Sequence, residues 1–226
     1  MAGVVALGWL GEDDDVELLE RIVCFGREPM ASAALASLVR LDTPVAFPLM
    51  RRWLRGSAQP LPAVVSAALV QVPRGALAAL IRHEAKARAT EMPGLLRIIG
   101  LRRDADGLIA VRGVLVDANA PAEALAAGLH ALSDIGRPSD VVFASRLLAH
   151  PDWAVRVRAV HAVARLGGWA YTPRLARLLD DPDPWVRRRV AEAVVADPAA
   201  SIDTSQLSER GQLAFAEALT RREVAA

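Results

Sequence analysis

The stretch PDWAVRVR at residues 151–158 is followed at a fixed distance by PDPWVRRR at residues 182–189. Five positions carry the same residue in both stretches, and the step from Pro151 to Pro182 gives a period of 31 residues (182 − 151). A period of this size is typical of solenoids, in which stacked copies of one small unit share a continuous core. The sequence therefore predicts a repeat protein.

Each unit is predicted to be a helix, a turn and a second helix. In the first copy, apolar residues recur at the spacing that places them on one face of a helix: Val155, Ala159, Ala162, Val163 and Leu166. Asp152 suits the N-cap of this helix, and Gly167 suits its end because glycine enters the left-handed conformation without steric cost. Thr172 and Pro173 suit the N-cap and first position of the next helix.

This pattern resembles the HEAT-repeat family, and more closely the bacterial HEAT-like repeats first described in phycobilisome lyases. Their units read Asp-x-x-Val-Arg-x-x-Ala-x-x-Ala-Leu-x-x-Leu-Gly, which the first copy matches with Asp152, Val155, Arg156, Ala159, Ala162, Val163 and Leu166-Gly167. The second copy keeps Asp183, Val186, Arg187, Ala193 and Val194, but has Val190 at the first Ala position and Asp197-Pro198 in place of Leu-Gly.

The resemblance implies an all-α fold, an α-solenoid with a right-handed superhelix of antiparallel helix pairs. It also implies that Arg156 and Arg187 belong to a ladder of ion pairs and hydrogen bonds between adjacent units, and are structural residues.

We expect a single domain over residues 1–226. Regular repeats are predicted at about 104–197, an irregular middle at 56–101, and a polar capping helix at about 205–222, with Ser205 as its N-cap. Because residues 2–10 resemble the second helix of a unit whose first helix is absent, we expect the chain to be a fragment of a longer protein. The alternative is that a partner subunit covers this end.

Further helices are predicted after Thr43 and at Pro29 to Leu41. Pro48 should kink the helix that follows Thr43 or delay its start by a turn. Arg51, Arg52 and Arg55 surround Trp53, which indicates an exposed helix end, with a recognition patch as the less favoured alternative.

Composition narrows the functional class only weakly. The formal net charge is +1, from 27 basic and 26 acidic residues, so nucleic acid and anionic membrane are not indicated as partners. Cys24 is the single cysteine, which excludes an internal disulfide and is consistent with a reducing compartment, so we expect a cytoplasmic protein. The resemblance to bacterial HEAT-like repeats implies a bacterial one. The sequence contains no run of about 18 apolar residues, and therefore no predicted membrane span.

No catalytic constellation, metal site or cofactor motif is recognisable. The four histidines fall in different units without ligand spacing, and the carboxylates lie mainly at turns and helix starts, where capping explains them. The single His83-Glu84 pair is too few for the di-iron site of deoxyhypusine hydroxylase, another HEAT-repeat protein. The enzyme alternatives that the resemblance suggests are a bilin lyase subunit and a HEAT-like DNA glycosylase.

Basic residues are more concentrated in the two repeated helices than elsewhere in the chain. We call five of them the basic ridge: Arg158, His161, Arg165, Arg188 and Arg189. The first three are neighbours on one side of a helix, and Arg189 repeats Arg158. One interpretation is that Asp152, Asp180, Asp181 and Asp183 neutralise the arginines of this region within the ladder. The other is that the ridge binds the carboxylates or phosphates of a partner.

The function expected from repeats without a catalytic site is a noncatalytic scaffold that binds another protein through its curved surface. The resemblance implies that the ridge lies near the binding face, and an acidic protein would suit it.

Overall fold

The computed structural model describes residues 3, 4, 7, 15–55, 61–71, 75–167, 169–197 and 202–225, without the side chains of Arg52, Trp169 and Ala225. Helices joined by short turns account for these ranges, and no strand occurs within them. The predicted all-α class is therefore confirmed. The expected helix at residues 2–10 lies largely outside the described residues.

The chain divides into two compact units, residues 1–114 and residues 115–226. The prediction of one continuous domain, and the predicted hand of the superhelix, stay predictions. The first unit contains α2 (Asp15–Phe25), α3 (Met30–Arg40), α4 (Ala46–Leu54), α5 (Ala63–Gln71), α6 (Ala76–Arg88), α7 (Pro93–Leu101), a short 3-10 turn η1 (Ala105–Gly107) and most of α8 (Leu108–Val116).

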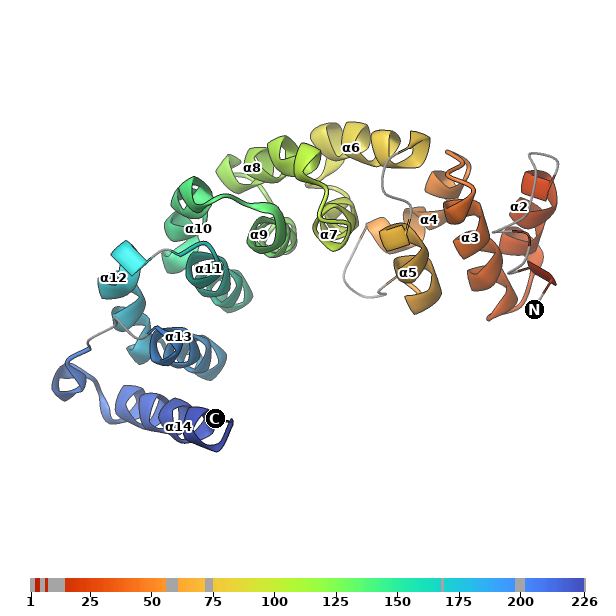
Figure 1. The fold of residues 1–226 in the computed structure, drawn as a ribbon. Coiled ribbons are helices and arrows are strands. Elements are labelled where there is room, and N and C mark those ends of the chain that lie inside the picture. Colours follow the sequence, from red (N-terminus) through yellow and green to blue (C-terminus); the bar gives the residue numbers. More distant parts are fainter. Residues whose placement is uncertain are drawn as a thin grey trace. The chain divides into compact units, whose positions relative to one another are not determined.

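In the first unit, each helix buries an apolar face against a neighbour. α3 packs between α2 and α5, and α6 packs on α7 (Figure 1). α4 begins at Ala46, so Pro48 lies in its first turn, where the missing N–H breaks no intrahelical bond. The helix therefore starts later than Thr43-Pro44, by two residues (46 − 44) rather than by the predicted turn.

A side chain of α3's terminal turn caps α6 across a long sequence distance. Asp42 has a positive φ of 53° and accepts hydrogen bonds from the backbone N–H of Ala76 at 2.7 Å and Leu77 at 3.2 Å. A Cβ on Gly75 would lie 1.6 Å from an Asp42 carboxylate oxygen, so any other residue there would displace this carboxylate from its capping position. This contact joins the end of α3 to the start of α6.

The second unit contains α9 (Ala122–Ile135), α10 (Val141–Arg146), α11 (Trp153–Arg165), α12 (Thr172–Arg177), α13 (Pro184–Ala196) and α14 (Glu209–Ala225). The 3-10 turns between them are η2 (Pro138–Asp140), η3 (Leu147–Ala149), η4 (Trp169–Tyr171), η5 (Leu178–Asp180) and η6 (Thr204–Gln206).

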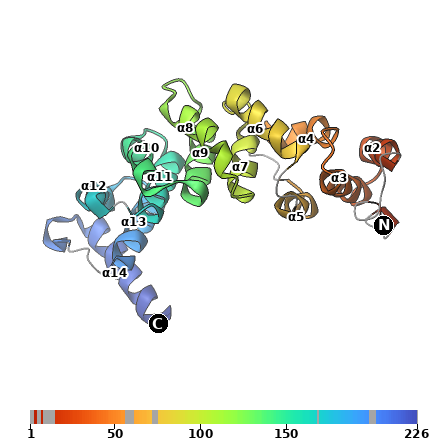
Figure 2. The ribbon, with the colours of Figure 1, turned by 45° about the horizontal axis from the view of Figure 1, so that its top comes forward.

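The helices of the second unit form two layers (Figure 2). α11 packs against α9 and α13, and α13 packs against α14, so these four helices make one continuous layer. α10 packs on α11 and α12 packs on α13, which places these short helices in the other layer. This arrangement of stacked helix pairs is an α-solenoid, as predicted.

Two helix starts differ from the sequence predictions. α12 begins at Thr172, directly after η4, so Tyr171 is its N-cap and the helix starts one residue earlier than expected. The cap of α14 is Ser208 rather than Ser205, since the Ser208 hydroxyl accepts from the N–H of Gly211 at 3.3 Å. Ser205 instead lies in η6, where Asp203 binds its N–H.

After Asp197 the chain departs from the pattern of the two preceding units, and the predicted repeat bounds stay a prediction. α13 ends at Ala196 with Asp197 as its C-cap, and no further helix of the α10 or α12 kind follows in the described residues. α14 nevertheless extends the layer formed by α9, α11 and α13, because it packs on α13 and η5. A Cβ on Gly211 would lie 3.0 Å from the Leu179 carbonyl oxygen, so glycine permits this close approach.

Candidate functional site

Aspartates cap the two repeated helices in the same way, as predicted. The Asp152 carboxylate accepts from the N–H groups of Ala154 at 2.8 Å and Val155 at 3.2 Å. In the next unit, the Asp183 carboxylate accepts from Trp185 at 2.8 Å and from Val186 at 3.4 Å. Both carboxylates thereby satisfy backbone donors at the positive end of a helix.

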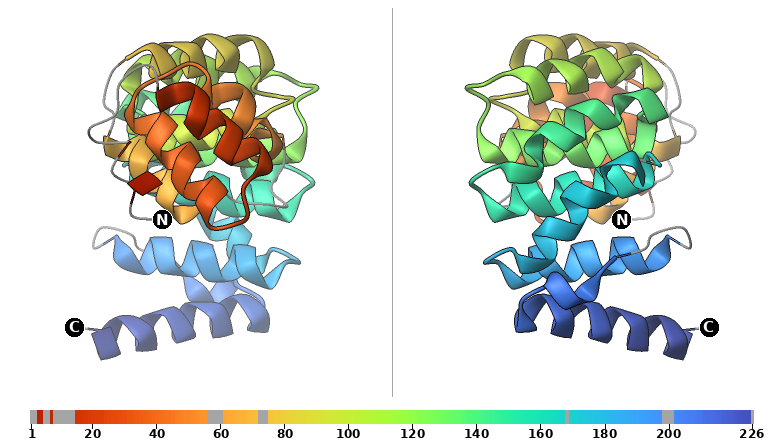
Figure 3. Two further views of the ribbon diagram at one scale, coloured as in Figure 1. Left: turned by 90° about the vertical axis from the view of Figure 1, so that its right-hand side faces the viewer. Right: turned by 90° about the vertical axis from the view of Figure 1, so that its left-hand side faces the viewer.

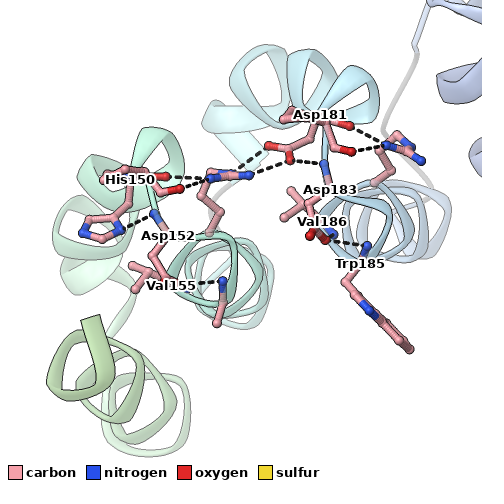
Figure 4. A network of polar contacts seen from close by, with 12 residues as sticks. His150, Asp152, Val155, Asp181, Asp183, Trp185 and Val186 are labelled. Carbon is pink, nitrogen blue, oxygen red and sulfur yellow. Dashed lines mark hydrogen bonds and ion pairs between the residues drawn. The ribbon is translucent and has the colours of Figure 1, made fainter. Parts of the chain in front are cut away.

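The predicted ladder is present between the two units, and Arg156 is its centre (Figure 4). Its Nε and Nη2 donate to the two carboxylate oxygens of Asp181 at 2.8 and 2.7 Å. Its Nη1 donates to the carbonyl oxygens of His150 and Pro151 at 2.9 and 2.8 Å. Every guanidinium nitrogen of this buried side chain therefore has an acceptor within the fold.

Arg187 repeats part of this arrangement one unit later. Its Nη1 donates to the carbonyl oxygens of Asp181 at 2.6 Å and Pro182 at 3.0 Å. Asp181 also accepts from the N–H of Asp183 at 2.9 Å. The turn at 181–183 therefore has contacts with Arg156 of the preceding unit and with Arg187 of the following helix. Both ladder arginines have the structural role that the resemblance implied.

The four aspartates proposed to neutralise the basic region all have other contacts. Asp152 and Asp183 cap helices, and Asp181 pairs with Arg156. Asp180 accepts from the backbone N–H and the hydroxyl of Ser208 at 3.0 and 2.6 Å, and so joins η5 to the start of α14. Their contacts tie them to the ladder and the caps, and none of these contacts reaches the basic ridge.

Three cationic residues of the ridge gather around His161 on α11. Burial is the main cause that lowers the pKa of His161, followed by the charges of Arg189, Arg158, Arg165 and then His130. Arg158 and Arg165 are exposed, and neither has a hydrogen bond or ion pair with another described residue. The structure thus brings α11 and α13 side chains of the ridge together.

Glu192 joins the α13 members of the ridge. Its carboxylate lies 2.9 Å from Arg188 Nε and 3.3 Å from Arg189 Nη1, and Arg221 of α14 approaches it at 3.9 Å. The Arg188 guanidinium also lies over the Trp185 ring, 5.9 Å from its centroid. The ridge therefore continues from α11 across α13 towards α14, which Figure 3 shows beside α13.

Sequence reasoning missed Glu192 and the contribution of α14. Glu192 lies four residues after Arg188, a spacing that indicates a helical ion pair and could have been found. Arg210, Leu213 and Arg221 of α14 lie 18 or more residues after Arg188 and Glu192 in the chain, so no local spacing relates them to the ridge. Their proximity comes from packing of α14 on α13.

The alternative patch around Trp53 is not assembled as a recognition site. The Trp53 side chain is buried, with 7% of its surface exposed, whereas Arg51 and Arg55 are exposed. Arg52's side chain lies outside the described part of the chain. The ring of Trp53 is therefore part of the core and is not available to a partner.

The described residues contain no group of three or more His, Cys, Asp or Glu side chains placed to hold a metal ion. Within the same residues, no single helix has both the length and the apolar composition to cross a membrane. The bent pair α5 and α6 meets those two criteria jointly, with an angle of 107° between them.

Comparison with known proteins identifies the repeated part of the chain. Residues 141–206 match the family model of HEAT repeats. No curated protein sequence gives a significant match to the chain. The matched segment contains α10 to α13, the ladder and the basic ridge. With the stacked helix pairs described above, this match identifies residues 141–206 as HEAT repeats.

Proposed function

We propose that the protein is a noncatalytic HEAT-repeat scaffold that binds an acidic protein partner through the basic ridge on α11 and α13. HEAT repeats generally serve as surfaces for protein interaction, which supports the scaffold role. The partner and its acidity are inferences from the side chains of the ridge.

One observation carries the proposal: the arginines of the repeat divide into two groups. Arg156 and Arg187 donate to acceptors within the fold, and Arg156 is buried. Arg158 and Arg165 are exposed and have no such partner among the described residues. Exposed arginines that the fold does not use are available for bidentate contacts with carboxylates.

The local charge favours a protein over a nucleic acid. Glu192 lies between Arg188 and Arg189 and would repel a continuous phosphate backbone. The net charge of +1 also provides little of the general attraction on which nucleic-acid binding depends. The carboxylates of a flexible acidic polypeptide can avoid Glu192, whereas the evenly spaced phosphates of a duplex cannot.

The experiment compares two triple variants of the full chain in a crosslinking pull-down. The ridge variant changes Arg158, Arg165 and Arg189 to Ser. The control variant changes Arg21, Arg27 and Arg55, which are exposed residues of the first unit, to Ser, and so removes the same charge. Partners captured by the wild type should be retained by the control and lost by the ridge variant. Equal capture by both variants would contradict the proposed function.

A further inference from the structure

A groove of about 410 Å³ lies between α13 and α14, adjacent to the basic ridge. Its lining includes Trp185 and Arg188 from α13, and Arg210, Leu213, Glu217 and Arg221 from α14. This volume falls in the range of about 300–1,000 Å³ that is usual for small-ligand pockets. The groove therefore has space for a large side chain of a partner.

Two apolar side chains in this groove are mostly open to water. The exposed fraction is 57% for Trp185 and 62% for Leu213, although each lies where two helices pack. Tryptophan is strongly enriched among residues that dominate binding energy at protein interfaces, because its large surface becomes buried. An apolar side chain placed against Trp185 and Leu213 would remove both surfaces from water.

The charged residues of the groove are mainly basic. Arg188 and Arg221 are partly engaged by Glu192 and Glu217, at distances of 2.9 and 3.1 Å. Arg210 is exposed and has no hydrogen bond or ion pair with any other residue that the structure describes. A free guanidinium beside an exposed indole favours an occupant that combines carboxylates with an apolar residue.

We propose that this groove binds an acidic peptide segment that carries one large apolar side chain. The apolar side chain packs on Trp185 and Leu213, and a neighbouring carboxylate of the peptide pairs with Arg210. This inference rests on the proposed function, because Arg188 belongs both to the ridge and to the groove. It adds to that function the chemical class of the partner segment.

A single-stranded nucleic acid is the main competing occupant, since bases stack on tryptophan and phosphates bind arginine. Glu217 lines the groove and Glu192 lies at its side, where both would oppose a phosphate chain. Leu213 offers an aliphatic surface, which suits an apolar side chain of a peptide. The observations therefore favour the peptide.

The test begins with a random dodecapeptide phage library selected on the full chain. One enriched peptide is then synthesised with a fluorescent label, and its affinity is measured by fluorescence anisotropy. Enriched sequences should combine Asp or Glu with Phe, Trp or Leu. Trp185→Ala should weaken the peptide's binding by about tenfold or more, as is usual for truncation of a central aromatic residue.

A matched control is Trp153→Ala, which removes another exposed tryptophan that does not line the groove. It should leave the affinity within about twofold of the wild type. Replacing the peptide's apolar residue by Ser should cause the same loss as Trp185→Ala. The two changes together should add little further loss, because they remove one contact between neighbours.

The outcomes separate this inference from the proposed function. Peptides that depend on Arg158, Arg165 and Arg189 but bind Trp185→Ala normally would overturn the groove and leave the ridge intact. Peptides that need Trp185, together with full partner capture by the ridge variant, would support the groove and contradict the ridge. Failure to enrich any peptide, or Trp185-dependent binding of labelled oligothymidylate in its place, would overturn the peptide assignment.

Discussion

Arg156 and Asp181 form a bidentate ion pair between consecutive repeats, with nitrogen–oxygen distances of 2.8 and 2.7 Å. The two residues are 25 positions apart in the chain and both are buried. The pair fixes the turn before α13 to the helix α11 of the preceding unit. A side chain used in this way is not available to a partner, which distinguishes it from Arg158 two positions later.

Arg156→Ala should lower the free energy of unfolding by about 3–5 kcal/mol, because it leaves the Asp181 carboxylate buried without its partner. Urea denaturation followed by circular dichroism would measure the change. Arg158→Ala is the control, since this exposed side chain on the same helix should contribute no more than about 0.5 kcal/mol. Similar stability of the two variants would show that the ladder does not hold the repeats together.

Ala162→Asp should destabilise the second unit by at least about 3 kcal/mol, because Ala162 is fully buried in α11 and the variant places an unpaired charge there. Ala216→Asp makes the same change at an exposed position of α14 and should have little effect. The comparison requires only thermal melts of both variants. An unchanged melt for Ala162→Asp would mean that α11 does not pack as described.

Asp42→Ala should lower the stability of the first unit by about 1 kcal/mol, since it removes the side-chain acceptor for two N–H groups at the start of α6. Asp42→Asn retains an oxygen acceptor and tolerates the positive φ, so it should retain most of the stability. Hydrogen exchange of the Ala76 and Leu77 amides would report the loss directly. Unaltered protection of these amides in Asp42→Ala would refute the capping role.

His161 should make stability depend on pH. Its folded-state pKa is lowered, chiefly by burial and then by the charges of Arg189, Arg158, Arg165 and His130, so the unfolded chain binds a proton more readily. The stability associated with neutral His161 is therefore present above the unfolded value of about 6.5 and is lost as the pH falls below it. In the His161→Gln variant, the free energy of unfolding should therefore fall less as the pH is lowered below about 6.5.

The same cluster predicts a shift that nuclear magnetic resonance can follow. In the Arg158, Arg165 and Arg189 to Ser variant, the pKa of His161 should rise towards its ordinary value, because three nearby positive charges are removed. The matched triple variant at Arg21, Arg27 and Arg55 should leave it unchanged. An identical titration of His161 in all three proteins would show that these arginines do not gather around it.

The local features of the repeats could be predicted from the sequence, because they depend on residues close together in the chain. The caps at Asp152 and Asp183 follow from their position before a helical pattern. The helix end at Gly167 follows from the tolerance of glycine for the left-handed conformation, and its φ is 72°. Prediction of the ladder depended on the family resemblance as well, since spacing alone does not show that Arg156 reaches Asp181.

Contacts between distant segments could not be predicted in this way. Asp42 caps a helix that begins 34 residues later, and Asp180 binds Ser208, which lies 28 residues away. The burial of Trp53 depends on helices packed around it, and its arginine neighbours suggested the opposite. The ridge residues themselves were identified from helical spacing, whereas the adjoining groove depends on how α14 packs against α13.

The most direct test of the basic ridge is the salt dependence of binding to a fluorescein-labelled polyglutamate peptide, measured by fluorescence anisotropy with the full chain. Charges exposed to water are screened over about 8–10 Å at physiological ionic strength, so the affinity of the wild type should fall as sodium chloride is raised. The variant with Arg158, Arg165 and Arg189 changed to Ser should bind more weakly and lose most of that dependence, while the variant at Arg21, Arg27 and Arg55 keeps both. The same affinity and the same salt slope in the ridge variant and the wild type would contradict the account.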